Sequence, residues 1–573
     1  MPKAKEPAAT AHDPVEAERL KVLGNELYMK NEYDAAHHTY SEAIKKDPTN
    51  AVLYANRAAV LLAQKVYMDA AYDCRKAVEL DPKYAKAWGR LGTASHALAA
   101  WTECLRAWKM ALDCLPKENL TPAQENMKAQ FTQGLAKARV ARKKIETSAV
   151  AVSDLEKMPW VVASELRNRK MASGKPSCVY VVCYAAEELK EAFKYLDFLK
   201  AVPGPNPGQT GLSGNPNCIE PLSNSILTDE RMFHLKDPDL PDKLRKQCLF
   251  ENGALKGWIE LAGPAMVREE AVKRQKKEGW KTTRPAIAVT IRIWIFQAYF
   301  RSQLLGHHDY ANEMYARAQE FLEWGRKQWP NASREQRGSI FETSFIRGVK
   351  RLRLESMHRS VALRGPESEF NHQDLIDFAQ DLIDDVSSDP PAGGELHVGH
   401  FIAYWIYPKA TALSILGWCF LEKGCSRPKS DPERAPALKT ASEYYLAAAD
   451  AYPEDEERHA QFLRKHLECL TALNKPLRDT LPVCKRIRVS GAEAMEIWGG
   501  GPYKDHLKKN MDEVKEFEDK WTGEIKAGRA TMDTVAGIKF TEKTLPKTEK
   551  DDIPFKVSFI DEEGEGEAGP SSK

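Results

Sequence analysis

The sequence lacks the paired cysteines that mark disulfide frameworks and zinc sites. Its 11 cysteines are an odd number, lie singly between Cys74 and Cys484, and include no CxxC pair. This distribution disfavours a secreted disulfide scaffold or a zinc finger and favours a reducing compartment. An excess of one charge is missing too, because 84 Lys and Arg against 82 Asp and Glu leave +2. So small a net charge gives no chain-wide field to attract nucleic acid or an anionic membrane.

Long hydrophobic runs are also scarce. The longest, Ala286 to Phe296, is interrupted by Arg292 and is too short to span a bilayer. Residues 1–18 lack the apolar core of a signal peptide and carry acids that a transit peptide avoids. We therefore predict a soluble, cytoplasmic protein, and its 573 residues correspond to about three or four domains.

Catalytic and cofactor motifs are missing as well. No Gly-x-Ser-x-Gly elbow or His-Glu-x-x-His pair occurs, and the Gly-Lys at 174–175 precedes Pro176 where a phosphate-binding loop has Ser or Thr. His397 and His400 have a spacing that can chelate a metal, but no further ligands are spaced to complete a site. We interpret this pair, and the thiols of Cys178 and Cys183, as structural, and expect no cofactor, no metal and no catalytic residue.

What the sequence does contain is a repeat of 34 residues at its N-terminus. Small residues recur where two helices approach closely, large residues where they fill the gap between neighbours, and a proline where the second helix must end. This pattern resembles the tetratricopeptide repeat, with units at 17–50, 51–84 and 85–118. The three sets in register are Leu20, Leu23, Gly24, Leu27, Ala36, Tyr40, Ala43 and Pro48; Tyr54, Arg57, Ala58, Leu61, Ala70, Cys74, Ala77 and Pro82; and Trp88, Leu91, Gly92, Ser95, Cys104, Trp108, Ala111 and Pro116.

A single hairpin of this kind cannot bury its apolar face alone. Stacking of neighbours is expected to form a right-handed superhelix with a concave groove lined by the first helices, and the last unit needs a cap with a polar outer face. Residues 122–148 are typical of such a capping helix, with Met127, Phe131, Leu135 and Val140 as its apolar stripe. We therefore predict a repeat domain over 16–148, preceded by a disordered N-terminus over 1–15.

Polar residues on the first helices of the units carry the functional signal, because a groove residue has no role in core packing. Lys21 and Asn25 are four apart and share a helix face, and so do Lys86 and Arg90. Asn56 and Arg90 are one period apart and hold equivalent positions on neighbouring helices. The set contains three cations, two amides and no acid, so it suits a carboxylate, and better two carboxylates held close together.

In these positions the chain resembles the tetratricopeptide co-chaperones with a dicarboxylate clamp. Their pattern is Lys-x-x-x-Asn in the first unit, Asn in the second and Lys-x-x-x-Arg in the third, matched here by KVLGN (21–25), YANRAA (54–59) and KAWGR (86–90). The resemblance implies binding of the C-terminal Glu-Glu-Val-Asp tail of heat-shock chaperones of the 90- or 70-kDa class. It also implies that Ala59 lines the groove. The clamp residues would be Lys21, Asn25, Asn56, Lys86 and Arg90.

The rest of the chain is less regular. Residues 149–284 are predicted to form a mixed or helical region, in which 178–184 (CVYVVCY) are compatible with a strand or with a helix. The Gly, Pro and Asn of 202–222 predict a loop. Repeat-like spacing returns over roughly 285–500 and predicts a degenerate tetratricopeptide-like helical region, with a non-repeating bundle as the alternative. A helical segment over 501–530 and a mostly disordered acidic tail over 531–573 complete the chain.

Two classes of function remain open at this stage. The first is a non-enzymatic, all-α co-chaperone or adaptor, whose clamp binds the chaperone tail and whose C-terminal helical region contacts a second protein. It would bind neither nucleic acid nor a membrane. The alternatives are an enzyme with an unrecognised catalytic domain in 149–283 that the repeats target, and a generic repeat scaffold unrelated to chaperones.

Overall fold

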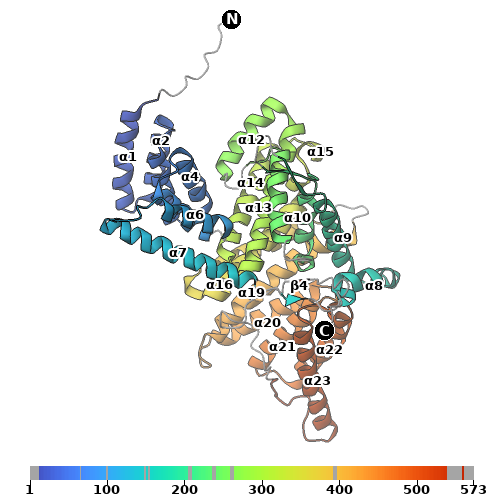
Figure 1. The fold of residues 1–573 in the computed structure, drawn as a ribbon. Helices are drawn as coiled ribbons and strands as arrows, with labels where there is room; N and C mark the ends of the chain where they lie inside the picture. Colours follow the sequence, from blue (N-terminus) through green and yellow to red (C-terminus); the bar gives the residue numbers. More distant parts are fainter. Residues whose placement is uncertain are drawn as a thin grey trace, which may run out of the picture. The chain divides into compact units, whose positions relative to one another are not determined.

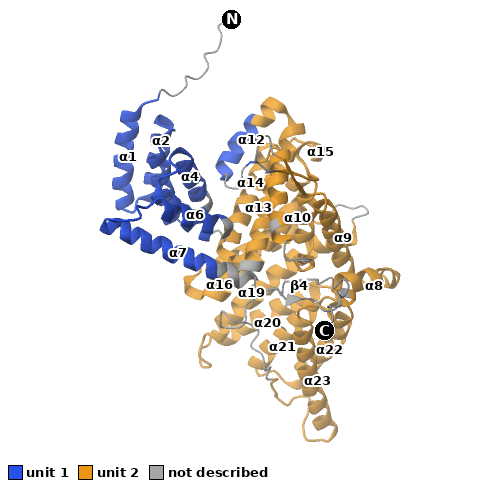
Figure 2. Cartoon of the chain, in the orientation of Figure 1, with its two compact units in different colours: residues 1–148, 258–273 blue, residues 149–257, 274–573 orange. Residues whose placement is uncertain are grey.

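The computed structural model shows an almost entirely helical chain, which confirms the predicted all-α class (Figure 1). It divides into two compact units, residues 1–148 with 258–273 and residues 149–257 with 274–573 (Figure 2). Among the described helices, none is long and apolar enough to cross a membrane. The described residues are 12–64, 66–97, 101–146, 150–151, 155–203, 210–234, 240–258, 263–391, 397–538 and 558–559.

Three helical hairpins and one longer helix make up residues 12–146. Helix α1 begins at Pro14, slightly before the predicted first unit, and the side chain of Asp13 caps it by accepting from the Glu16 amide at 3.1 Å. The hairpins pair α1 with α2, α3 with α4 and α5 with α6. The bounds are α1 Pro14–Met29, α2 Tyr33–Lys46, α3 Ala51–Ala63, α4 Tyr67–Leu80, α5 Ala85–Ala97, α6 Trp101–Asp113 and α7 Pro122–Glu146.

Small-on-large packing closes these hairpins, as the repeat pattern predicts. A Cβ atom on Gly24 would lie 2.8 Å from the Tyr40 ring, and one on Gly92 would lie 2.6 Å from the Trp108 ring. Side chains at these two glycines would therefore push the paired helices apart. Ala36 and Ala43 of α2 are completely buried, which is consistent with their place at the close approach of the helices.

Helix α7 packs through a stripe that differs at one end from the prediction. Phe131 is buried, and its ring fills the space beside Gly89 of α5. Val140, predicted in the stripe, is 70% exposed, while Ala138 is buried. The reason is geometric: at 100° per residue Val140 lies opposite Phe131, whereas Ala138 shares its face.

The larger unit is a helical assembly with two short strand pairs. β1 (Val150–Ala151) pairs in parallel with β4 (Ser558–Phe559), and β2 (Lys200–Pro203) pairs antiparallel with β3 (Thr210–Ser213). Helix α12 (Pro264–Glu278) contains the boundary at residue 273 between the two units. The other helices are α8 Pro159–Ser173, α9 Val179–Leu196, α10 Ile219–Thr228, α11 Leu240–Ala254, α13 Trp280–Leu305, α14 His308–Gln328, α15 Arg334–Arg337, α16 Thr343–Arg364, α17 His372–Ser388, α18 Val398–Phe401, α19 Tyr407–Cys425, α20 Arg434–Ala451, α21 Glu457–Ala472, α22 Leu477–Trp498 and α23 Lys504–Lys526. A π-helix, Ile402–Ile406, joins α18 to α19.

Two segments of the middle region, 178–184 and 202–222, have a secondary structure that their composition did not determine. The run at 178–184 is the start of helix α9, where Val179, Val181 and Val182 are all buried. A helix that is buried on most sides can contain the same short apolar run as a buried strand. Hydrophobic periodicity therefore could not show whether 178–184 forms a helix or a strand. The loop predicted over 202–222 is wrong at both ends, because β2 and β3 flank residues 204–209 and α10 begins at Ile219.

Close packing of a glycine against an aromatic ring also occurs in the larger unit. Gly306 lies at φ +66° between α13 and α14, and Tyr315 of α14 is buried. Gly417 of α19 faces Tyr445 of α20, where a Cβ would lie 2.9 Å from the ring, much as Gly24 faces Tyr40. The predicted domain limits, including a repeat array over 285–500, stay predictions.

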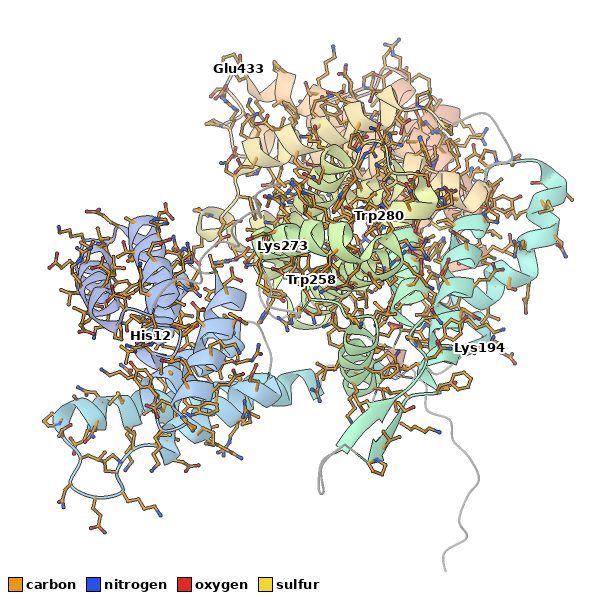
Figure 3. The ribbon with its side chains drawn as sticks, turned by 90° about the horizontal axis from the view of Figure 1, so that it is seen from above. His12, Lys194, Trp258, Lys273, Trp280 and Glu433 are labelled. Carbon is orange, nitrogen blue, oxygen red and sulfur yellow. The ribbon has the colours of Figure 1, made fainter. Side chains whose placement is uncertain are left out.

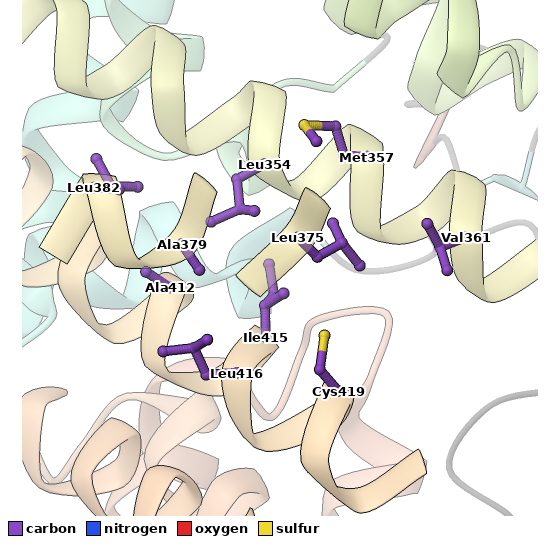
Figure 4. Packing of buried hydrophobic residues seen from close by; sticks show 10 residues of the cluster. All are labelled: Leu354, Met357, Val361, Leu375, Ala379, Leu382, Ala412, Ile415, Leu416 and Cys419. Carbon is purple, nitrogen blue, oxygen red and sulfur yellow. The ribbon is translucent and has the colours of Figure 1, made fainter. Parts of the chain in front are cut away.

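Apolar clusters hold the helices of this unit together. Leu354, Leu375 and Leu416 come from α16, α17 and α19 and meet in one buried cluster (Figure 4). Trp280 lies at the start of α13 (Figure 3). Its ring is edge-on to the ring of Trp329, with ring centroids 5.0 Å apart. Beyond α23, Ile538 is buried against the same unit, although the sequence predicts disorder from residue 531. Most of the predicted tail lies outside the described residues.

A buried carboxyl group organises the start of α10. Glu251 of α11 is 1% exposed, and its carboxylate oxygens accept from the backbone N–H groups of Cys218 at 2.6 Å and Ile219 at 2.9 Å. These are two of the amides that the first turn of a helix leaves without partners. Burial raises the pKa of Glu251 to about 7, even though both amides favour the ionised form.

This cap predicts a pH dependence. The folded state holds the Glu251 proton to about pH 7, whereas an unfolded glutamate loses it near about 4.3. Its contribution to stability is therefore full below about pH 4.3 and is lost as the pH rises to about 7, by about 4 kcal/mol in total. Glu251→Gln should flatten that part of the profile. Urea denaturation of both proteins at pH 5 and pH 8 measures the difference, and identical pH profiles would contradict the prediction.

Candidate peptide-binding site

The first two predicted clamp residues lie on helix α1. Lys21 and Asn25 are one turn apart, Asn25 is exposed and Lys21 is half-buried. The Nζ atom of Lys21 forms an ion pair with Glu18 Oε1 at 2.7 Å, and Glu18 is 57% exposed. The sequence reasoning did not consider this acid, which lies at i−3 on the same helix. Surface pairs of this kind contribute little, so Lys21 remains available to another carboxylate.

Asn25 and Asn56 are brought together across the first two repeats. Asn56 of α3 donates from Nδ2 to Oδ1 of Asn25 at 3.1 Å. The hydroxyl of Tyr40, from α2, donates to the same oxygen at 2.6 Å. Tyr40 was predicted only as a packing residue, and the signal that could have revealed its second role is the hydroxyl itself, since phenylalanine would fill the same space.

The last two predicted residues lie on α5. Arg90 donates from Nη1 to the backbone oxygen of Ala55 at 2.6 Å, which ties its guanidinium to helix α3 next to Asn56. Lys86, one turn earlier, is exposed. Ala59, one turn beyond Asn56 on α3, is half-buried. Three cations and two amides therefore lie on the first helices of three consecutive hairpins.

A largely buried ion pair joins the helices of the first two repeats. Arg57 of α3 donates to both carboxylate oxygens of Asp73 on α4, at 2.7 and 2.8 Å, and to Ser41 Oγ of α2 at 3.0 Å. Burial raises the pKa of Asp73, and Arg57 offsets part of that rise. Because one guanidinium joins three helices, α3 is held in register with the first repeat.

The histidines and cysteines that the sequence offered as metal-binding or reactive candidates pack among other side chains. His397 and His400 lie against the ring of Tyr184, with centroids 5.2 and 6.3 Å away. No group of three or more His, Cys, Asp or Glu side chains suited to a metal occurs among the described residues. Cys178 and Cys183 are buried, and burial raises the pKa of the Cys183 thiol to about 11. Both thiols are therefore protonated at neutral pH.

Comparison with known proteins agrees with the helical hairpins. Residues 24–65 match the family model of the tetratricopeptide repeat. The chain is 38% identical over 142 residues to small glutamine-rich tetratricopeptide repeat-containing protein 2 of Saccharomyces cerevisiae, covering 25% of this chain and 38% of that protein. It is 36% identical over 110 residues to heat-shock protein cognate co-chaperone sgt12 of Aspergillus fumigatus (19% and 32%), and 29% identical over 164 residues to human serine/threonine-protein phosphatase 5 (28% and 32%).

These matches concern only part of each protein. The chain spans about a third to two-fifths of the length of the relatives it matches. The matched segments cover between about a fifth and three-tenths of this chain. Within those limits the predicted resemblance is confirmed: the N-terminal part of the chain contains a tetratricopeptide repeat and is similar to tetratricopeptide-repeat co-chaperones.

Proposed function

We propose that the chain is a non-enzymatic, cytoplasmic adaptor whose repeats bind the C-terminal Glu-Glu-Val-Asp tail of a heat-shock chaperone. The observation that supports this most is the hydrogen bond between Asn56 and Asn25, together with the bond from Arg90 to the backbone oxygen of Ala55, which precedes Asn56. Lys21 and Lys86 add positive charge one turn away on the same two outer helices. A chain terminus that ends in aspartate offers two carboxylates to such a set.

The mechanism is charge-assisted hydrogen bonding to a flexible peptide. The lysine and arginine side chains carry full positive charge at neutral pH, and the two amides supply directed N–H donors. The tail orders only when bound, so part of the interaction free energy is spent on ordering it and the affinity is expected to be on the order of micromolar. The residues involved are exposed or half-buried, so binding should weaken as salt screens the charges.

The larger unit is proposed as a second protein contact. It contains most of the chain, whereas the match to the Saccharomyces cerevisiae relative covers 25% of the chain. Human serine/threonine-protein phosphatase 5 matches over 28% of this chain. That relative is named as a phosphatase and is matched over 32% of its own length. We assign no catalytic role to residues 149–283 of this chain.

A direct titration tests the proposal. A fluorescently labelled peptide ending in Met-Glu-Glu-Val-Asp is titrated with the full chain, and its anisotropy is followed at low salt and at about 0.5 M salt. We expect micromolar binding that weakens with salt. A peptide with the same composition in scrambled order is the control. Absence of binding by a folded chain, or equal binding of both peptides, would refute the chaperone-tail assignment.

A further inference from the structure

The side-chain amide of Asn25 has a fixed orientation. Its Oδ1 atom accepts from the Tyr40 hydroxyl at 2.6 Å and from Asn56 Nδ2 at 3.1 Å. An amide oxygen has two lone pairs, so both are used. Within the described part of the chain, no hydrogen bond from Asn25 Nδ2 is formed, and the residue is exposed. The two N–H donors of Asn25 are therefore the part of the amide that remains for a ligand.

Reversing this amide would break the arrangement. The NH₂ group of Asn25 would then face the NH₂ group of Asn56, setting donor against donor. The Tyr40 hydroxyl proton would also lose its acceptor, and a buried hydroxyl without a partner is costly. With the Asn56 amide oriented as it is, the three side chains support one another only when the Asn25 oxygen points inward and its nitrogen outward.

Tyr40 is held firmly enough to impose that orientation. Its ring is 2% exposed and packs where Gly24 has no side chain, so the hydroxyl position follows from the packing of α2 on α1. Burial raises the pKa of Tyr40 to about 12, so the phenol keeps its proton throughout the physiological range. It therefore retains the proton that it donates to Asn25, and this hydrogen bond helps to orient the amide.

We propose that Tyr40 is a positioning residue that makes the site select a carboxylate over a carboxamide at the peptide terminus. This inference rests on the proposed function, because it concerns the same peptide. A carboxylate only accepts hydrogen bonds and meets the outward N–H groups of Asn25. A carboxamide carries its own N–H donors, for which the inward, saturated Asn25 oxygen offers no acceptor. Once the Tyr40 hydroxyl is removed, the Asn25 amide can rotate and present its oxygen to such donors.

The test is Tyr40→Phe in the full chain, titrated with a peptide ending in Met-Glu-Glu-Val-Asp and with its C-terminally amidated form. We expect the acid peptide to bind about five- to tenfold more weakly to the variant, while the amidated peptide changes less. The ratio of the two dissociation constants should therefore fall. Tyr54→Phe is the matched control, since it loses a hydroxyl that donates to the Pro48 backbone oxygen at 3.2 Å in the same repeat domain.

The outcomes separate this inference from the proposed function. If the wild-type chain binds neither peptide, the proposed function fails. If the wild type prefers the acid peptide and Tyr40→Phe keeps the same preference, the positioning role of Tyr40 is refuted while the clamp stands. An equal loss of both peptides accompanied by a lower melting temperature would mean a packing role alone, and would also overturn the inference.

Discussion

Replacing Lys86 and Arg90 together with alanine is expected to weaken binding of the Met-Glu-Glu-Val-Asp peptide by about 100-fold. Each side chain is proposed to form a charge-assisted hydrogen bond with the peptide, and each such bond contributes about 1.5–3 kcal/mol. Losing two therefore costs at least about 3 kcal/mol, and about 1.4 kcal/mol is a factor of ten. Arg90 also holds the Ala55 carbonyl at 2.6 Å, so its loss loosens the contact between α5 and α3.

A matched double variant shows whether binding is lost because clamp residues are removed or because positive charge is removed. Lys76→Ala with Lys83→Ala removes two positive charges from the same repeat domain, in the neighbouring second unit and at positions outside the predicted clamp. Lys76 pairs with Glu79 at 2.7 Å on α4, and Lys83 is exposed. This control should change the affinity less than about threefold. Comparable loss in both double variants would show that net charge, and not a built site, attracts the peptide.

Glu230→Gln is expected to produce the largest loss of stability in the larger unit, about 3–5 kcal/mol. Glu230 is 1% exposed and accepts from Arg351 Nη1 at 2.6 Å and from Arg458 Nη2 at 2.7 Å. Burial by itself raises the pKa of Glu230, but the two arginines outweigh burial and hold the pKa well below its ordinary value. Glutamine keeps the shape and removes the charge, which leaves two cations without this counter-ion.

The measurement needs a probe of the larger unit alone, because two units need not unfold together. Hydrogen exchange of α16 peptides under native conditions reports local opening there, and protection should fall by about two to four orders of magnitude. Glu187→Gln is the control: it breaks a surface pair with Arg167 in which Glu187 is 59% exposed, and should change stability by less than about 0.5 kcal/mol. Undiminished protection in Glu230→Gln would mean that this ionic cluster does not hold the unit together.

The repeat domain could be predicted from the sequence because its determinants are local and periodic. Gly24 and Tyr40 are 16 positions apart in one unit, and the same pair of sizes returns in the third unit as Gly92 and Trp108. The structure places these residues in contact, as the spacing requires. The set of candidate clamp residues follows from the same register, since Asn56 and Arg90 hold equivalent positions on neighbouring helices.

The larger unit could not be predicted in this way, because the contacts that determine it join distant segments. Arg458 pairs with Glu230, 228 residues away, and Asp455 accepts from the Cys178 amide 277 residues away. Neither pairing leaves a periodic trace in the sequence. The same holds for Glu251, whose role as a helix cap depends on α11 packing beside the start of α10. Within the candidate site, Tyr40 was missed because its ring alone explains its place in the repeat.

The carboxylate clamp is tested most directly by comparing two peptides that differ only in their C-terminal group, which is a carboxylate in one and a carboxamide in the other. The wild-type full chain is titrated with the Met-Glu-Glu-Val-Asp peptide as a free acid and as a C-terminal amide, under identical salt and pH. We predict micromolar binding of the acid and at least about tenfold weaker binding of the amide. The residues proposed to bind the terminal carboxylate are Lys21, Asn25, Asn56, Lys86 and Arg90. Equal affinity for the two peptides would contradict recognition of the terminal carboxylate.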